Sequence, residues 1–116
     1  MDLLKQISNS EDKDIIVSLP KNKLWLEYLS HFMELKSGGN QFGIIVSTVP
    51  KTTRGKKCFL VFDGFLRGYM EIHKIRENED NDIVIDLNPM FYSISHKIHM
   101  SDIDEYKYYF DNSNTQ

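Results

Sequence analysis

The spacing of the hydrophobic residues changes once along this sequence, at Gly38-Gly39-Asn40, and that change limits what the chain can fold into. Before the glycines, over residues 21–36, apolar side chains recur every three or four positions, which is the spacing of an amphipathic helix. The apolar residues of this segment are Leu24, Trp25, Tyr28, Leu29, Phe32, Met33 and Leu35. We expect Ser18 to cap the helix and Pro20 to lie in its first turn. The pattern predicts one helix, which the glycines end.

Beyond the glycines the apolar runs are short and are separated by turn residues, which is typical of β-strands. We expect strands at residues 42–49, 58–62, 65–75 and 83–87, and two short strands between residues 90 and 110. A first strand at residues 14–19 is expected before the helix. Asp63-Gly64 favours a tight hairpin turn, and Gly68 predicts a bulge or a close backbone approach. The strand at 42–49 should be covered on both faces. The alternating strand at 83–87 should be half exposed, with an edge that can pair with a second copy.

Strands this short and numerous must close on themselves or pack face to face to bury their apolar sides. We therefore predict an α+β fold: a small, mostly antiparallel β-barrel with one amphipathic helix after the first strand. A chain of 116 residues fits one domain. We place that domain at residues 14–110, with a flexible segment at 1–13 and a disordered tail at 111–116.

The segment GKKCFLVFDGFLRGYMEI, residues 55–72, resembles the PUA-like barrel superfamily, which includes the ASCH and EVE domains. The matching features are Gly55-Lys56 before an apolar strand, the pattern Gly68-Tyr69-Met70-Glu71-Ile72 after the hairpin, and the aromatic ending HKIHMSDIDEYKYYF. The ASCH signature after the helix is absent, since that stretch reads KSGGNQF, so the amidohydrolase activity of some ASCH members is not implied. The resemblance implies a barrel that binds nucleic acid or a modified nucleotide.

Positive charge is concentrated in one part of the chain, although the whole protein carries a net charge of −3. Residues 51–76 contain seven basic and two acidic side chains, whereas residues 77–116 contain two basic and nine acidic ones. The loop at 51–57 combines cations and hydroxyls that can contact phosphates. The candidate phosphate-binding residues are Lys51, Thr52, Thr53, Arg54, Lys56 and Lys57, with Arg67. The alternative is that the acidic part folds back and neutralises this segment.

Aromatic residues near the basic segment are candidates for stacking on bases. We name Trp25, Phe65 and Tyr69 for this role. Trp25 also lies on the apolar face of the predicted helix, together with Tyr28, so a place in the core is the alternative for both. Phe65 follows a turn and precedes Arg67 by two residues, which favours an exposed ring beside a cation.

The remaining chemistry-bearing residues form no recognisable catalytic or metal-binding motif. Cys58 is the one cysteine and lies in an apolar run, which excludes an internal disulfide and indicates a buried thiol in a reduced, cytoplasmic setting. His96 and His99 should point to opposite faces of a strand, so we predict no metal. We predict no cofactor, no membrane span and no secretory signal. An enzyme acting on a nucleotide derivative stays open, with Glu71 or a histidine as the base.

Two functions follow from these patterns. The first is a module that binds RNA, single-stranded DNA or a modified nucleotide through the 51–57 loop. The second is a small acidic protein-interaction or inhibitor protein, of the kind that mobile elements encode, which presents its carboxylates to a basic protein partner. The carboxylates in question belong to Glu77, Glu79, Asp80, Asp82, Asp102, Asp104 and Glu105.

Overall fold

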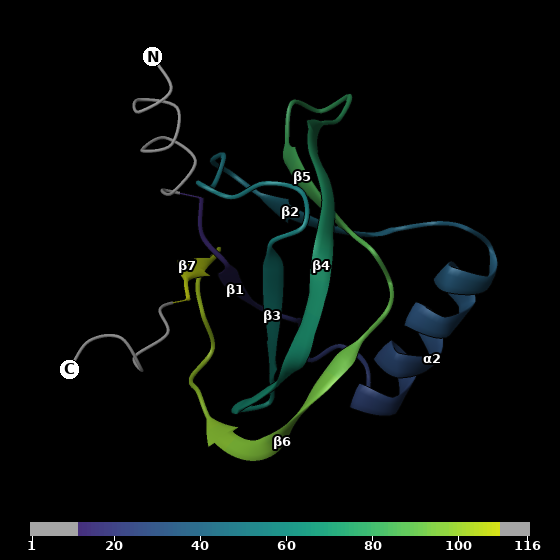
Figure 1. Cartoon of the computed structure of the whole chain (residues 1–116), viewed down its shortest axis with the longest axis vertical. Helices are drawn as coiled ribbons and strands as arrows, with labels where there is room; N and C mark the ends of the chain where they lie inside the picture. The colour runs from purple at the N-terminus through teal and green to yellow at the C-terminus, as the bar shows by residue number, and fades with distance from the viewer. Residues whose placement is uncertain (1–11, 110–116) are drawn as a thin grey trace.

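The computed structural model describes residues 12–109, in which one helix stands beside a bent β-sheet (Figure 1). The elements in chain order are β1 (Ile15–Ser18), α2 (Trp25–Ser37), β2 (Phe42–Val46), β3 (Lys57–Phe62), β4 (Phe65–Glu77), β5 (Ile83–Leu87), β6 (Tyr92–His99) and β7 (Lys107–Tyr108). The segments expected to be flexible or disordered lie outside the described residues, except for residues 12 and 13.

The long strand β4 is the centre of the sheet. The strand order is β2-β5-β4-β3-β1-β7, and β6 also pairs with β4. Residues 65–71 of β4 pair with β3 on one edge, while β6 and then β5 follow one another along the other edge. At the point where β5 takes over from β6, the N–H of Asn88, directly after β5, donates to the Glu71 carbonyl of β4 at 2.9 Å. All pairs are antiparallel except β1 with β3.

The two outer strands, β2 and β7, are linked by side chains. Among residues 12–109 no backbone ladder joins them, so the structure shows an open, mostly antiparallel seven-stranded sheet in a small α+β domain. The Ser47 N–H donates to Glu105 Oε1 at 2.6 Å, and the hydroxyls of Thr48 and Tyr106 lie 2.9 Å apart. The Lys51 N–H donates to the Tyr108 hydroxyl at 2.9 Å. The predicted closure into a barrel is thus replaced by a row of side-chain contacts.

Helix α2 starts later than the sequence predicts. It begins at Trp25, and the Leu24 N–H donates to Glu27 Oε1 at 2.6 Å, which satisfies the start of the helix without Ser18 or Pro20. The Ser18 hydroxyl instead accepts the N–H of Ile103 at 2.6 Å. The end at Gly38 agrees with the prediction.

Only a narrow stripe of α2 faces the sheet. Tyr28 and Phe32 are buried, and the Phe32 ring lies 5.0 Å from Phe42 and 6.1 Å from Phe91. The expected apolar face was too wide, because Leu24 and Met33 are exposed to solvent. Figure 1 shows the helix at one side of the sheet, next to β6.

The hairpin between β3 and β4 confirms the prediction made from Asp63-Gly64. Both residues have positive φ, 51° and 83°, as a two-residue hairpin turn requires. Further along β4, the ladder with β3 passes from Leu60 opposite Gly68 to Val61 opposite Leu66, which leaves one extra residue on β4. A Cβ atom at Gly68 would lie 2.1 Å from the Tyr92 carbonyl oxygen. Gly68 therefore marks both a bulge and a close backbone approach.

Two predictions about individual strands, those for β5 and β2, were wrong. Strand β5 lies between β2 and β4, so Val84 and Asp86 are buried and it is not a sheet edge. The edge strand is β2, whose Ile45 is 61% exposed where cover on both faces was expected. The two strands expected between residues 90 and 110 are present as β6 and β7, although β6, with eight residues, is longer than predicted.

The buried Asp86 carboxylate is paired with Arg76 on the neighbouring strand. Arg76 Nε donates to Asp86 Oδ2 at 2.6 Å and Nη2 donates to Oδ1 at 3.3 Å. The hydrogen bond and the negative charge of Asp86 both raise the pKa of Arg76. This pair explains how the alternating strand β5 accommodates a charge in its buried part.

The predicted burial of Cys58 is confirmed. Burial raises the pKa of its thiol far above the ordinary range, because the low-dielectric core disfavours the thiolate. We therefore expect folded protein at pH 8 to react with Ellman's reagent at least about a hundredfold more slowly than protein in denaturant. The absorbance of the released thiolate measures both rates, and equal rates would contradict a stably buried Cys58.

Candidate functional site

The residues predicted to form one binding site lie at two ends of the sheet. The 51–57 loop precedes Lys57 at the start of β3, and the strand then runs about 17 Å before the hairpin turn. Phe65 and Arg67 follow that turn, so they lie at the far end of β3 from the loop (Figure 1). The expectation that Arg67 and the aromatic residues flank the loop was therefore wrong for Arg67, Phe65 and Trp25.

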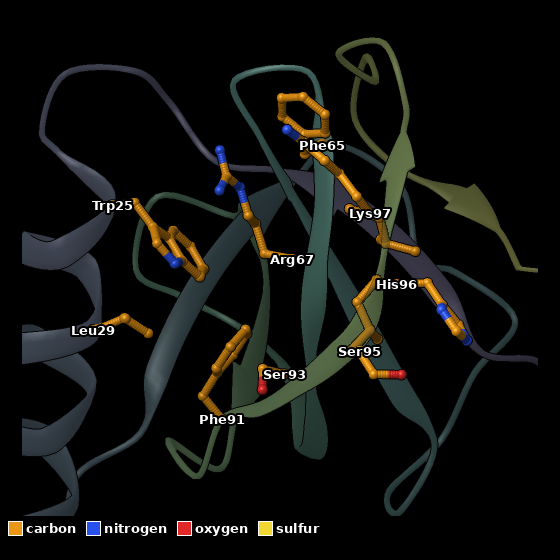
Figure 2. Close-up of a pocket in the computed structure, with 11 residues that line it drawn as sticks. Trp25, Leu29, Phe65, Arg67, Phe91, Ser93, Ser95, His96 and Lys97 are labelled. Carbon is orange, nitrogen blue, oxygen red and sulfur yellow. The ribbon is translucent and has the colours of Figure 1, made fainter.

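A pocket of about 600 Å³ opens between α2, β4 and β6, and we call it the helix pocket (Figure 2). Trp25 and Leu29 line it from the helix, Phe65 and Arg67 from β4, and Phe91 from the segment before β6. The lining from β6 comprises Ser93, Ile94, Ser95, His96 and Lys97. Aromatic rings thus form the walls, while hydroxyls and cations supply the polar groups.

Arg67 is fixed in the helix pocket by a backbone contact and three rings. Its Nε–H donates to the Phe62 carbonyl at 3.0 Å, and its guanidinium carbon lies 5.5 Å from the ring centres of Trp25 and Phe65 and 5.6 Å from that of Phe62. No carboxylate within residues 12–109 forms an ion pair with it. The two terminal amino groups are therefore held in place and unpaired.

Two further basic side chains lie beside Phe65. Lys97 Nζ is 4.8 Å from the centre of the Phe65 ring, and the His99 ring is 4.5 Å from it at 45°. His96 also lines the helix pocket, but Figure 2 shows that its ring points away from Trp25. No carboxylate belongs to the lining, so Arg67 and Lys97 give the pocket a positive potential.

Sequence reasoning found Trp25, Phe65 and Arg67 but missed Phe91, Lys97 and His99. A signal for the last two was available, because Lys97 and His99 lie two residues apart in a strand. Residues with this spacing share one face, although nothing in the sequence shows that this face meets Phe65.

The other aromatic candidates lie outside the helix pocket. Tyr28 is a core residue, and burial raises the pKa of its hydroxyl, which donates to the Pro20 carbonyl at 2.6 Å. Tyr69 stacks on Tyr92 with ring centres 5.0 Å apart, and Lys57 Nζ lies 4.9 Å from its ring centre. Tyr69 is thus the one stacking candidate that stays near the basic loop.

The 51–57 loop is tied to β4 by its backbone. The Gly55 N–H donates to the Ile72 carbonyl at 2.9 Å, and the Ile72 N–H donates to the Lys56 carbonyl at 2.8 Å. Thr52, Thr53 and Arg54 line a second pocket of about 630 Å³, which we call the loop pocket. Lys51, Lys56 and Lys57 do not belong to its lining.

Among the residues that the structure describes, the cations of the loop form no ion pair with the acidic part of the chain. Within residues 12–109 no ion pair involves Lys51, Arg54, Lys56 or Lys57. Asp102, from the acidic part, lies 3.8 Å from Lys21 Nζ, outside the loop. The alternative in which the carboxylates fold back onto the loop therefore finds no support in the described residues.

The carboxylates proposed to bind a basic protein do not form one surface. Those of residues 77–82 lie at the end of the β4–β5 hairpin, whereas those of residues 102–105 lie between β6 and β7, at the other side of the molecule (Figure 1). Asp102 faces Lys21, and Glu105 accepts hydrogen bonds from Ser47. Several of them thus have structural partners.

Within residues 12–109 no group of three or more His, Cys, Asp or Glu side chains could hold a metal ion. In the same part of the chain no helix has the length and apolar character needed to cross a membrane. Comparisons of the chain with protein-family models, with curated proteins and with solved structures find no match. The geometry of the two pockets is therefore what bears on function.

Proposed function

We propose that this chain binds single-stranded nucleic acid or a modified nucleotide, and that the helix pocket takes one base and its phosphates. The observation that carries the proposal is Arg67, held against three aromatic rings with unpaired terminal amino groups in a pocket without a carboxylate. An arginine that is fixed in this way can donate two parallel hydrogen bonds to a phosphate.

The rest of the pocket suits the other parts of a nucleotide. Rings such as Phe65 and Trp25 offer faces for stacking, and base stacking contributes about 1–3 kcal/mol per base. Lys97, 4.8 Å from the Phe65 ring centre, can contact a second phosphate. The volume of about 600 Å³ lies in the range of about 300–1,000 Å³ that is usual for small-molecule sites. A base must leave a duplex to enter such a pocket, which favours single strands.

The resemblance to PUA-like domains supports the same proposal. It implies a barrel that binds nucleic acid or a modified nucleotide, and the bent antiparallel sheet with one helix at its side is compatible with that architecture. On the motifs of residues 55–72 we also propose that this chain is related to the PUA-like superfamily. The helix pocket is defined by Arg67 and its neighbours, which lie partly outside those motifs.

Trp25 makes the proposal directly testable, because it is the only tryptophan in the chain and lines the helix pocket. Titration with RNA or DNA oligomers of about eight nucleotides should quench its fluorescence as a base stacks nearby. Binding should weaken with salt by at least about 1.4 log units per log unit of salt, since at least two phosphates are contacted.

Variants inside and outside the helix pocket distinguish binding in this pocket from a general effect of positive charge. Arg67→Ala with Lys97→Ala should weaken binding about tenfold to a hundredfold, because two charge-assisted contacts are lost. Lys107→Ala in β7 removes one positive charge outside both pockets and should change the affinity less than about threefold. Wild-type affinity in the double variant, or no quenching with any oligomer or nucleotide at low salt, would contradict the proposed function.

A further inference from the structure

We propose that the loop pocket is a second anion site, which binds a phosphate group independently of the helix pocket. It lies where the 51–57 loop crosses the second half of β4, and its lining includes Thr52, Arg54, His73 and Lys74. His73 and Lys74 come from β4, about twenty residues after the loop, and the sequence pattern did not connect them with it.

The first observation is an unsatisfied hydroxyl. Thr52 Oγ1 is buried and has no hydrogen-bond partner among the described residues, although the Thr52 N–H donates to the Pro50 carbonyl at 2.9 Å. Buried polar groups nearly always have a partner, and each exception calls for an explanation. Rotation of the Thr52 side chain toward the loop pocket would let a bound phosphate oxygen accept the proton of this hydroxyl and supply the missing partner.

The second observation is the balance of charge around that hydroxyl. Arg54 and Lys74 form no ion pair within residues 12–109, and Arg76 uses Nε and Nη2 on Asp86 but keeps Nη1. Glu77 is the one carboxylate in the lining. The cations outnumber it, so the pocket favours an anion with several acceptor oxygens.

The two pockets lie at opposite ends of β4, so they are separate sites. The helix pocket uses residues 65–67 at the start of β4, and the loop pocket uses residues 73–77 at its end. Figure 1 draws β4 along the length of the molecule, so one phosphate cannot occupy both pockets. The ligand of the loop pocket is a phosphate monoester or diester, supplied by a free phosphorylated compound or by the backbone of a nucleic acid.

Backbone amide NMR during titration with inorganic phosphate tests the site, with sodium chloride at equal ionic strength as the reference. We expect shifts at residues 52–54 and 73–76 that chloride does not produce. Thr52→Val keeps the shape and removes the hydroxyl, and it should weaken phosphate binding about fivefold. Arg54→Ala with Lys74→Ala should weaken it about tenfold or more. Identical shifts with phosphate and chloride would overturn the proposal.

Two further measurements identify the source of the phosphate and distinguish this site from the helix pocket. Arg67→Ala removes the phosphate ligand of the helix pocket, and it should leave the phosphate-dependent shifts at residues 52–54 and 73–76 unchanged, whatever it does to oligomers. If the Arg54→Ala, Lys74→Ala variant loses affinity for an oligomer of about twelve nucleotides but not for a mononucleotide that quenches Trp25, the phosphate comes from a nucleic-acid backbone. If only binding of free phosphate weakens, the site serves a phosphorylated small molecule. Loss of the shifts at residues 52–54 and 73–76 in Arg67→Ala would contradict two independent sites.

Discussion

Replacing Gly68 with alanine is expected to lower the free energy of unfolding by about 3–5 kcal/mol. The new Cβ would lie 2.1 Å from the Tyr92 carbonyl oxygen and 2.9 Å from Ser93 Cα. Both are backbone atoms of β6, so a change of side-chain rotamer cannot relieve the contact. Gly68 also has a φ of +154°, which side chains with L configuration rarely adopt. Strand β6 must therefore move away from β4.

Thermal unfolding followed by circular dichroism measures this effect. The midpoint should fall by about 12 °C or more, given about 4 °C for each kcal/mol in a domain of this size. Gly39→Ala is the control, because Gly39 has a φ of +73° but no atom within 4 Å of the new Cβ. It should cost only about 1 kcal/mol. Equal losses in the two variants would show that the approach of β6 is not what requires glycine at position 68.

Phe32→Ala is expected to destabilise the protein by a similar amount, about 3–5 kcal/mol. The side chain is 2% exposed, and its ring lies 5.0 Å from Phe42 and 6.1 Å from Phe91. These contacts join α2 to the segments that lead into β2 and β6. Truncation leaves a cavity between the helix and the sheet, and it also loosens one wall of the helix pocket, because Trp25 lies on the same helix.

Urea unfolding followed by Trp25 fluorescence provides the comparison. Met33→Ala, one residue further along the helix, is the matched control, because Met33 is 70% exposed and its truncation should change stability by less than about 0.5 kcal/mol. The Phe32 variant should also bind oligomers more weakly than Met33→Ala under conditions where both remain folded. Similar unfolding midpoints for the two variants would mean that α2 is not held to the sheet by Phe32.

The features that could be predicted from sequence are those that local chemistry determines. The helix follows from apolar spacing, and the Asp63-Gly64 turn follows from the need for positive φ. The bulge at Gly68 and the burial of Cys58 are also local signals, because each residue stands within its own apolar strand. In each case the deciding information lies within a few neighbouring residues.

The order of the strands could not be predicted in this way. Strand β5 shows the alternation of a half-exposed strand, yet Val84 and Asp86 are buried, and β2 pairs with its second edge. The choice between an edge and a central position depends on which distant strand arrives there. The predicted barrel was only partly correct for the same reason, since β2 and β7 approach without forming a ladder.

In the candidate site, too, local features could be predicted from the sequence and tertiary contacts could not. The sequence indicated the cations of the 51–57 loop, which are exposed or half-buried as a polar loop should be. It grouped Arg67 with them because the charges are close along the chain, whereas the hairpin carries Arg67 to the opposite end of the sheet. The helix pocket combines residues 25–29, 65–67 and 91–97, and only tertiary packing brings these segments together.

The link between β2 and β7 has a mechanical consequence. A carboxylate and four hydroxyls form this seam, and no strand pairing crosses it among the described residues. Separating the segment after β2 from the segment at β7 would break these contacts and the backbone hydrogen bond from the Lys13 N–H to the Lys51 carbonyl, while every strand pair of the sheet stays intact. The two margins of the open sheet can therefore move apart without unfolding any strand.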